Sequence, residues 1–289
     1  MTTPQTTRGW INGFIGVVLF SGSLPATRAA VLDLDPVFLT LARAAIAGVL
    51  ALAVLLISGE KRPAPSQLLS LLVVAIGVVV GFPLLSALAL QYITSAHSLV
   101  FLGLLPLATA AFGVLRGGER PHPLFWLFSV IGSLLVIAYA VWQGITASPK
   151  GNVLMLGAIF LCGLGYAEGA ALSRKLGGWQ VISWALVLSL PVMLPLAFVY
   201  LPPSVAGVRP AAWIGLAYVS LFSMFIGFIF WYRGLAQGGI ASVGQLQLLQ
   251  PFFGLALAAT LLHEHISPGM LAVTVGVIAC VYASKKYAE

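Results

Sequence analysis

Glu168 is the side chain in this sequence with the clearest capacity for chemistry. It is the only acid well inside a long apolar run, in the stretch LGYAEGAAL. A charged side chain inside a membrane is costly, so it usually faces a cavity or a partner. Glu168 could therefore bind a substrate ammonium or carry a coupling proton. The alternative is a structural carboxylate that is paired near the end of a helix.

Arg43 is the matching cation, about two turns into the second predicted helix. It could hold the carboxylate of a substrate, or that of an acid on a neighbouring helix. In the second, structural interpretation, the arginine fixes its own helix in the bundle.

The histidines allow one candidate and exclude another. His97, in SAHSL, begins the predicted fourth span, and Ser242 lies 145 positions later (242 − 97). Both could flank a central cavity near opposite membrane faces, although a lone histidine is also an ordinary packing residue. His263 and His265 lie two positions apart and lack the four-residue spacing of a helical zinc site, so no metal site is predicted.

Amides gather in the ninth predicted helix. Gln247 and Gln250 are three positions apart and share a helix face, whereas Gln245 points elsewhere. Buried amides need water or polar partners, so we expect this face to line a cavity, with hydrogen bonding between helices as the alternative. Gln91 and Tyr92 end the third predicted span and could add polar contacts from the outer side.

Aromatic residues could bind an apolar substrate group by stacking. Phe225, Phe228 and Tyr232 recur at helical spacing, and Tyr166 and Trp184 are further candidates. Packing against lipid, or an aromatic belt at the membrane surface, explains such residues equally well.

The composition indicates that transmembrane helices carry these side chains. Charged residues make up 7% of the chain and hydrophobic ones 60%, whereas soluble domains carry about 25% charged residues. Uncharged runs long enough to cross a bilayer recur along the chain. They must be helices, because a lone strand leaves its backbone groups unpaired in lipid. The net charge of +7 is scattered and forms no basic face, so no nucleic acid is expected as a partner.

The apolar runs, and the proline, glycine and charged residues that separate them, predict an all-α membrane protein with ten transmembrane helices. The expected spans are 10–30, 36–58, 67–90, 95–115, 122–142, 151–173, 179–200, 210–234, 240–262 and 267–284. With the N-terminus inside, ten of the 14 lysines and arginines fall in inner segments and three near the outer face. Basic residues accumulate in cytoplasmic loops, so both termini are expected in the cytoplasm.

Three landmarks recur half a chain apart. Pro251, Glu264 and Pro268 each lie 145 positions after Pro106, Glu119 and Pro123 (251 − 106, 264 − 119 and 268 − 123). We therefore predict two five-helix repeats, 1–147 and 148–289. An odd number of spans forces the second repeat to start from the opposite face. Inverted repeats of this kind are typical of secondary transporters, with the substrate site near the midplane.

Several stretches then resemble a known family. They are LFSGSLPATRAA (19–30), Arg43 within DPVFLTLARAAIAGV, Pro106 with GER (118–120), WYRGLA (231–236) and Pro251 with HEHIS. In order and spacing they resemble the drug/metabolite transporter superfamily, in its ten-helix group of two EamA-type repeats. Within it the chain looks most like the bacterial aromatic amino-acid exporters called YddG. The resemblance implies amino-acid efflux across an inner membrane, and it favours the structural role for Arg43 over direct binding of a substrate. Ser21 stands where many relatives have Trp, which leaves the substrate preference open.

The expected function is export of amino acids, including aromatic ones, and related small metabolites by alternating access around a midplane cavity in a bacterial inner membrane. The partners are a small amphipathic substrate and the lipid bilayer, no cofactor is expected, and a monomer is compatible with the sequence. The alternatives are another cargo, such as a hydrophobic drug, and an intramembrane enzyme. An enzyme would need paired acids, an activated nucleophile or metal ligands, and Glu168 stands alone.

Overall fold

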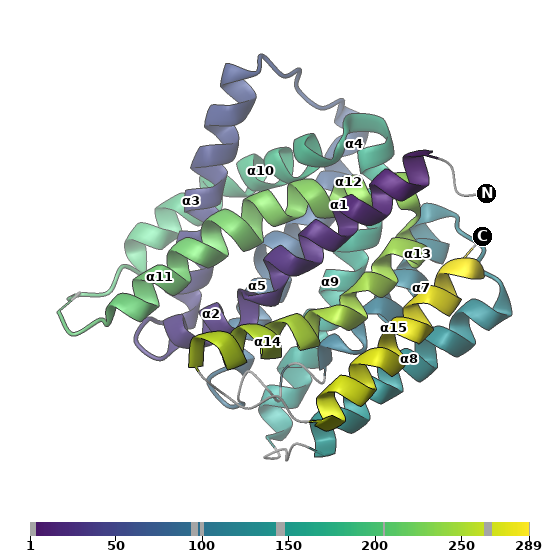
Figure 1. Cartoon of the computed structure of the whole chain (residues 1–289). Coiled ribbons are helices and arrows are strands. Elements are labelled where there is room, and N and C mark those ends of the chain that lie inside the picture. The colour runs from purple at the N-terminus through teal and green to yellow at the C-terminus, as the bar shows by residue number, and fades with distance from the viewer. Residues whose placement is uncertain are drawn as a thin grey trace.

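The computed structural model describes residues 4–93, 98, 101–142, 148–204, 206–262 and 268–288, and within these ranges the chain is helical and has no strand. Figure 1 shows the helices packed as one bundle. In the first half they are α1 (Pro4–Ser21), α2 (Ser23–Val31), α3 (Pro36–Ile57), α4 (Pro65–Val74), the π-helix η1 (Ala75–Gly81), α5 (Phe82–Ala89), α7 (Leu105–Gly117) and α8 (Pro123–Trp142). In the second half they are α9 (Pro149–Leu176), α10 (Gly178–Val199), α11 (Pro210–Tyr218), the π-helix η2 (Val219–Ile226), α12 (Gly227–Gly238), α13 (Ile240–Gly244), the 3₁₀-helix η3 (Gln245–Leu249), α14 (Gln250–Leu262) and α15 (Pro268–Lys286).

Six helical segments of the described chain are long and apolar enough to cross a membrane. They are Gln5–Val31, Pro36–Ile57, Pro65–Ala89, Pro149–Leu176, Gly178–Val199 and Pro210–Gly238. The shorter helices Leu105–Gly117 and Pro123–Tyr139 are also apolar. The chain is therefore a multi-pass, all-helical membrane protein, and the count of ten spans stays a prediction.

Helix ends follow proline and glycine. Asp35 caps α3, because its carboxylate accepts the backbone N–H groups of Val37 and Phe38 at 2.8 and 3.0 Å, and Pro36 opens the helix. α9 runs to Leu176, three residues past the predicted end of that span, because the next helix breaker is Gly177 at φ +96°. α12 likewise continues to Gly238, four residues past its predicted end, and stops at Gly239 with φ +90°.

Helix starts recur at one offset. The first residues of α9, α11, α14 and α15 each follow those of α1, α4, α7 and α8 by 145 positions (149 − 4, 210 − 65, 250 − 105 and 268 − 123). The two π-helices also correspond, since η1 begins at Ala75 and η2 at Val219. The repeat of landmarks in the sequence is thus a repeat of helix positions.

Helices of each half also pack against helices of the other half. α1 packs against α12, and α9, which matches α1, packs against α4, η1 and α5. α3 packs against α10, and α8 lies beside α15 (Figure 1). Each half therefore completes its core with helices of the other.

Glycines allow the closest of these contacts. A Cβ atom on Gly234 of α12 would lie 2.5 Å from the backbone nitrogen of Gly13 on α1. A Cβ on Gly77 of η1 would lie 2.8 Å from the Cα of Gly165 on α9. Small residues are what lets membrane helices approach so closely.

Both termini lie at one end of the bundle (Figure 1). The Lys285 ammonium lies 4.4 Å from the centroid of the Trp10 ring, and the His122 N–H donates to the Tyr287 carbonyl at 3.1 Å. This end, which we call the termini end, gathers segments in which the sequence concentrates basic residues.

The opposite end is tied by contacts between the halves. Arg209, just before α11, donates to both carboxylate oxygens of Asp33, which follows α2, with Nε–Oδ2 and Nη2–Oδ1 distances of 2.9 Å. A second contact joins Lys150 at the start of α9 to Tyr92 after α5, because the Lys150 ammonium donates to the Tyr92 hydroxyl at 2.7 Å.

The Asp33–Arg209 pair predicts how stability responds to acid. Hydrogen bonds from the Arg209 side chain hold the pKa of Asp33 below its ordinary value of 3.8. A carboxyl group whose pKa is lowered in the folded state stabilises the fold at pH values above its ordinary pKa. This stabilisation is lost as the pH falls through the folded-state pKa. We expect the Tm gap between the native protein and Asp33→Asn to be constant above about pH 5 and to narrow below about pH 4. A gap that stays constant in this acid range would contradict the prediction.

Candidate functional site

An enclosed cavity lies between residues of both halves. It is bordered in the first half by Phe20, Ser23 and Arg43, and in the second half by Tyr166, Ser223, Phe228 and Gln250. The volume of this cavity is about 20 Å³. That is room for roughly one water molecule, so a substrate does not fit in this conformation.

Arg43 is the charged group of this cavity. Its side chain is carried by α3 and the residue is only 4% exposed. Nη2 donates to the Ser223 hydroxyl at 3.2 Å, and Nε has no hydrogen-bond partner among the described residues. Ser23 also donates to Ser223, at 2.6 Å. These three side chains bring α2, α3 and η2 together.

No described acid pairs with Arg43. Asp33, Glu119 and Glu168 are bound by Arg209, Arg174 and Arg116, respectively. Asp35 caps α3, and Glu60 lies in the loop that follows it. In the described part of the chain, the expected carboxylate on a neighbouring helix is therefore missing, and the guanidinium faces the cavity instead.

Aromatic rings form one wall of the site. Phe228 packs against Phe20 and Tyr166, with ring centroids 5.1 and 5.9 Å apart. Tyr166 also lies 5.3 Å from Trp231. Such a wall offers ring faces and edges to an apolar substrate group.

The other predicted aromatic residues lie elsewhere. Tyr232 is buried behind Phe228, and its hydroxyl donates to the Gly165 carbonyl at 3.0 Å. Phe225 is buried in η2 and Trp184 is half-buried in α10, and neither borders the cavity.

Glu168 lies outside the cavity and is paired. Its Oε2 accepts a hydrogen bond from Arg116 Nε at 2.6 Å. The Glu168 side chain is 7% exposed and that of Arg116 is 45% exposed. This arrangement matches the structural alternative for Glu168, and its partner comes from the other half of the chain.

The three glutamines have different surroundings. Gln250 borders the cavity, and its Nε2 donates to the Phe20 carbonyl at 3.2 Å. Gln245 and Gln247 are buried in η3, and the amide atoms of Gln245 have no hydrogen-bond partner within the described chain. A buried polar group without a partner costs about 1–3 kcal/mol, so this 3₁₀ segment is a place where water or a ligand group would bind favourably.

The remaining candidates lie at the two ends. Ser242 is buried beside a recess at the termini end that Glu119 also borders. Gln91 and Tyr92 are exposed in the turn after α5, at the opposite end. His97 lies outside the described residues, as do His263, Glu264 and His265.

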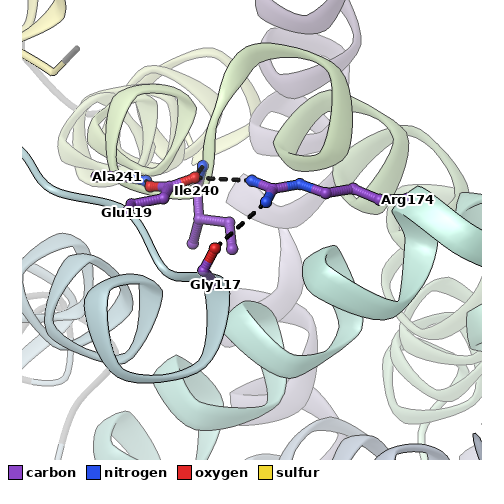
Figure 2. A network of polar contacts seen from close by, with 5 residues as sticks. All are labelled: Gly117, Glu119, Arg174, Ile240 and Ala241. Carbon is purple, nitrogen blue, oxygen red and sulfur yellow. Dashed lines mark hydrogen bonds and ion pairs between the residues drawn. The ribbon is translucent and has the colours of Figure 1, made fainter.

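A polar network joins helices of both halves at the termini end (Figure 2). The Glu119 carboxylate accepts the backbone N–H groups of Ile240 and Ala241, at 2.6 and 2.7 Å, and so caps α13. Arg174 donates to Glu119 at 2.9 Å and to the Gly117 carbonyl at 3.4 Å. We call these residues the Glu119 latch; it joins the α7–α8 loop of the first half to α9 and α13 of the second.

Sequence reasoning proposed Tyr166, Phe228 and Gln250, which border the cavity, and missed others. Phe20 and Ser23 lie in the stretch LFSGSLPATRAA, whose resemblance to the family was a signal for them. Ser223 carried no such signal, because one serine in an aromatic run has many uses. Arg43 was noticed, but as a structural residue.

A bundle of apolar membrane helices around a small cavity with polar and aromatic lining residues is compatible with a small-molecule transporter. The comparisons with known proteins agree. The chain belongs to the EamA-like transporter family, which matches residues 7–141 and again residues 149–284. It is therefore a multi-pass membrane transporter.

Two relatives extend this finding over most of the chain. "Uncharacterized transporter YdeK" of Bacillus subtilis (strain 168) is 67% identical over 285 residues, which is 99% of each chain. An "uncharacterized transporter" of Archaeoglobus fulgidus is 24% identical over 251 residues, 86% of this chain and 87% of the relative. Neither name specifies a cargo.

A protein of known crystal structure has the same fold. It superimposes with a TM-score of 0.78 at 18% identity, over 96% of this chain and 97% of the other. At this identity the likeness carries the fold and nothing about the substrate.

Proposed function

We propose that this transporter exports amino acids, including aromatic ones, and related small metabolites across the bacterial inner membrane. The observation that carries the proposal is the cavity itself. It combines one buried cation, two serine hydroxyls and a wall of aromatic rings, and residues of both halves enclose it. A small molecule with one polar end and one apolar end suits such a site. The resemblance to the YddG exporters supports the same cargo.

We further propose that the protein is built from two inverted five-helix repeats, 1–147 and 148–289. Helix starts 145 residues apart support this division, as do the exchanged packing partners. The family also matches the chain twice, once in each half.

Alternating access then requires each end to open in turn. The closed cavity, at about 20 Å³, is far smaller than the roughly 300 Å³ of even a small ligand pocket. Loading would therefore separate the Glu119 latch at the termini end. Release would separate Asp33 from Arg209, and Tyr92 from Lys150, at the other end. The concentration of basic residues near the termini favours a cytoplasmic position for the latch.

Flux through purified protein tests the proposal. We expect proteoliposomes that contain the transporter to take up labelled amino acids, with phenylalanine and tryptophan among them, faster than empty liposomes. A panel that also contains neutral hydrophobic drugs separates the two candidate cargos. Uptake equal to that of empty liposomes across the whole panel would refute amino-acid export.

A further inference from the structure

We infer that Arg43 binds the carboxylate of the transported molecule, so that the cargo is a class of small carboxylates with an apolar group, whether or not they carry an ammonium. The inference rests on the proposed transport function and names the chemistry of its site. It departs from the sequence-based interpretation, in which Arg43 served the structure of α3.

The first argument is the isolation of the charge. Arg43 is 4% exposed and, among the described residues, none of its neighbours is an acid. A guanidinium has five N–H donors, and the contact with Ser223 uses one of them. A buried charge without a counter-ion is strongly destabilising. A carboxylate that enters the cavity would supply that counter-ion.

The second argument is the supply of donors around Arg43. The Ser223 hydroxyl oxygen accepts from both Ser23 and Arg43, at 2.6 and 3.2 Å. Its own O–H is therefore left to donate to an acceptor. Arg43 Nε also lacks a partner in the described chain, and the planar fork of a guanidinium matches the two oxygens of a carboxylate. The polar side of the cavity is thus rich in donors.

Among the described residues, the cavity lining has no acid that could pair with an ammonium. Glu168 is held by Arg116 outside the cavity. The rings of Phe20, Tyr166 and Phe228 also line the cavity. Ring faces attract an ammonium and accept an apolar group as well. The carboxylate is therefore required and the ammonium is optional.

Four probes of similar size separate these requirements without any mutation. L-Phenylalanine has both charges, 3-phenylpropanoate has the carboxylate alone, and phenylalaninamide and phenethylamine have the ammonium alone. We expect the two carboxylates to bind the purified transporter, measured by quenching of tryptophan fluorescence, about 10- to 100-fold more tightly than the two amines. Equal binding of phenethylamine and 3-phenylpropanoate, or no binding of any probe, would overturn the inference.

Three variants then assign the preference to one side chain. Arg43→Gln should lose the preference for carboxylates, and Arg43→Lys should keep part of it because a cation remains. Arg233→Gln removes an exposed guanidinium of α12 that does not border the cavity, so it should behave like the native protein. An unchanged preference in Arg43→Gln would overturn the assignment. If that variant does not fold, the probe series and Arg43→Lys decide.

Binding tests the carboxylate site and flux tests transport, so the two proposals can fail independently. Carboxylates that bind through Arg43 but do not cross proteoliposome membranes would refute transport and leave the carboxylate site standing. Equal flux of all four probes would support transport and overturn the carboxylate requirement.

Discussion

Glu119→Gln is expected to open the termini end of the bundle. In the native protein the carboxylate accepts three donors, the Ile240 and Ala241 N–H groups and Arg174. A glutamine keeps one oxygen and turns its own NH₂ group toward one of the backbone donors. The Arg174 side chain is 40% exposed, so the ion pair itself contributes less than about 1 kcal/mol. The lost cap of α13 contributes more, about 2 kcal/mol.

A loss of about 2 kcal/mol, if the latch forms only in the closed state, shifts the population toward an open form about 30-fold. The shift can be measured by the reaction of a membrane-impermeant maleimide with Ser242→Cys. Ser242 is buried beside the latch, and a background without Cys162 and Cys280 removes other thiols.

The control for the Glu119 latch is Glu60→Gln. Glu60 lies in the loop after α3, away from α13, and its replacement removes the same charge. Labelling should accelerate in Glu119→Gln and stay at the native rate in Glu60→Gln. Equal labelling rates in the two variants would mean that Glu119 does not hold this end closed.

Gly234→Ala is expected to disrupt the α1–α12 contact. The added Cβ would lie 2.5 Å from the nitrogen and 2.8 Å from the Cα of Gly13, and 3.0 Å from the oxygen of Gly9. All three are backbone atoms, so no rotamer change relieves the clash and the helices must move apart. We expect a loss of about 1–3 kcal/mol in the free energy of unfolding, seen as a lower Tm in detergent.

Gly276→Ala is the matched control for this packing. A Cβ there would meet only the Cδ1 atom of Leu135, at 3.3 Å, which is the end of a flexible side chain. Its Tm should stay near that of the native protein. If both alanine variants melt at the same temperature as the native chain, the glycine contact is not a determinant of stability.

Much of the fold could be predicted from local chemistry. The length of the apolar runs identifies the membrane helices, and prolines such as Pro36, Pro65 and Pro210 mark where helices start. The end of α9 was placed too early, because the apolar run stops at the charged residues Arg174 and Lys175, whereas the helix continues to Gly177. Gly163 and Gly165 allow contacts between helices, and no local pattern reveals the partners.

The π-helices explain a further difference. Phe225 and Phe228 were assigned to one face by ordinary helical spacing. Phe225 lies in η2, where the hydrogen bonds skip one more residue, so the face rotates before Phe228 in α12. Phe228 borders the cavity and Phe225 does not.

Partners distant in sequence explain the rest. Glu168 could be cavity-lining or paired, and its partner Arg116 is 52 residues away. Arg43 meets Ser223 across 180 residues. Apolar periodicity tells which side chains a helix buries, but the helix packing decides whether a polar one meets a partner or a cavity.

Small carboxylates are expected to cross the membrane through the cavity around Arg43. Counterflow of labelled L-phenylalanine into proteoliposomes preloaded with unlabelled phenylalanine tests this, compared among the native protein, Arg43→Gln and Arg233→Gln. We expect uptake above that of empty liposomes for the native protein and Arg233→Gln, and at least about a tenfold lower rate for Arg43→Gln. Native uptake no faster than in empty liposomes, or uptake unaffected by Arg43→Gln, would contradict it.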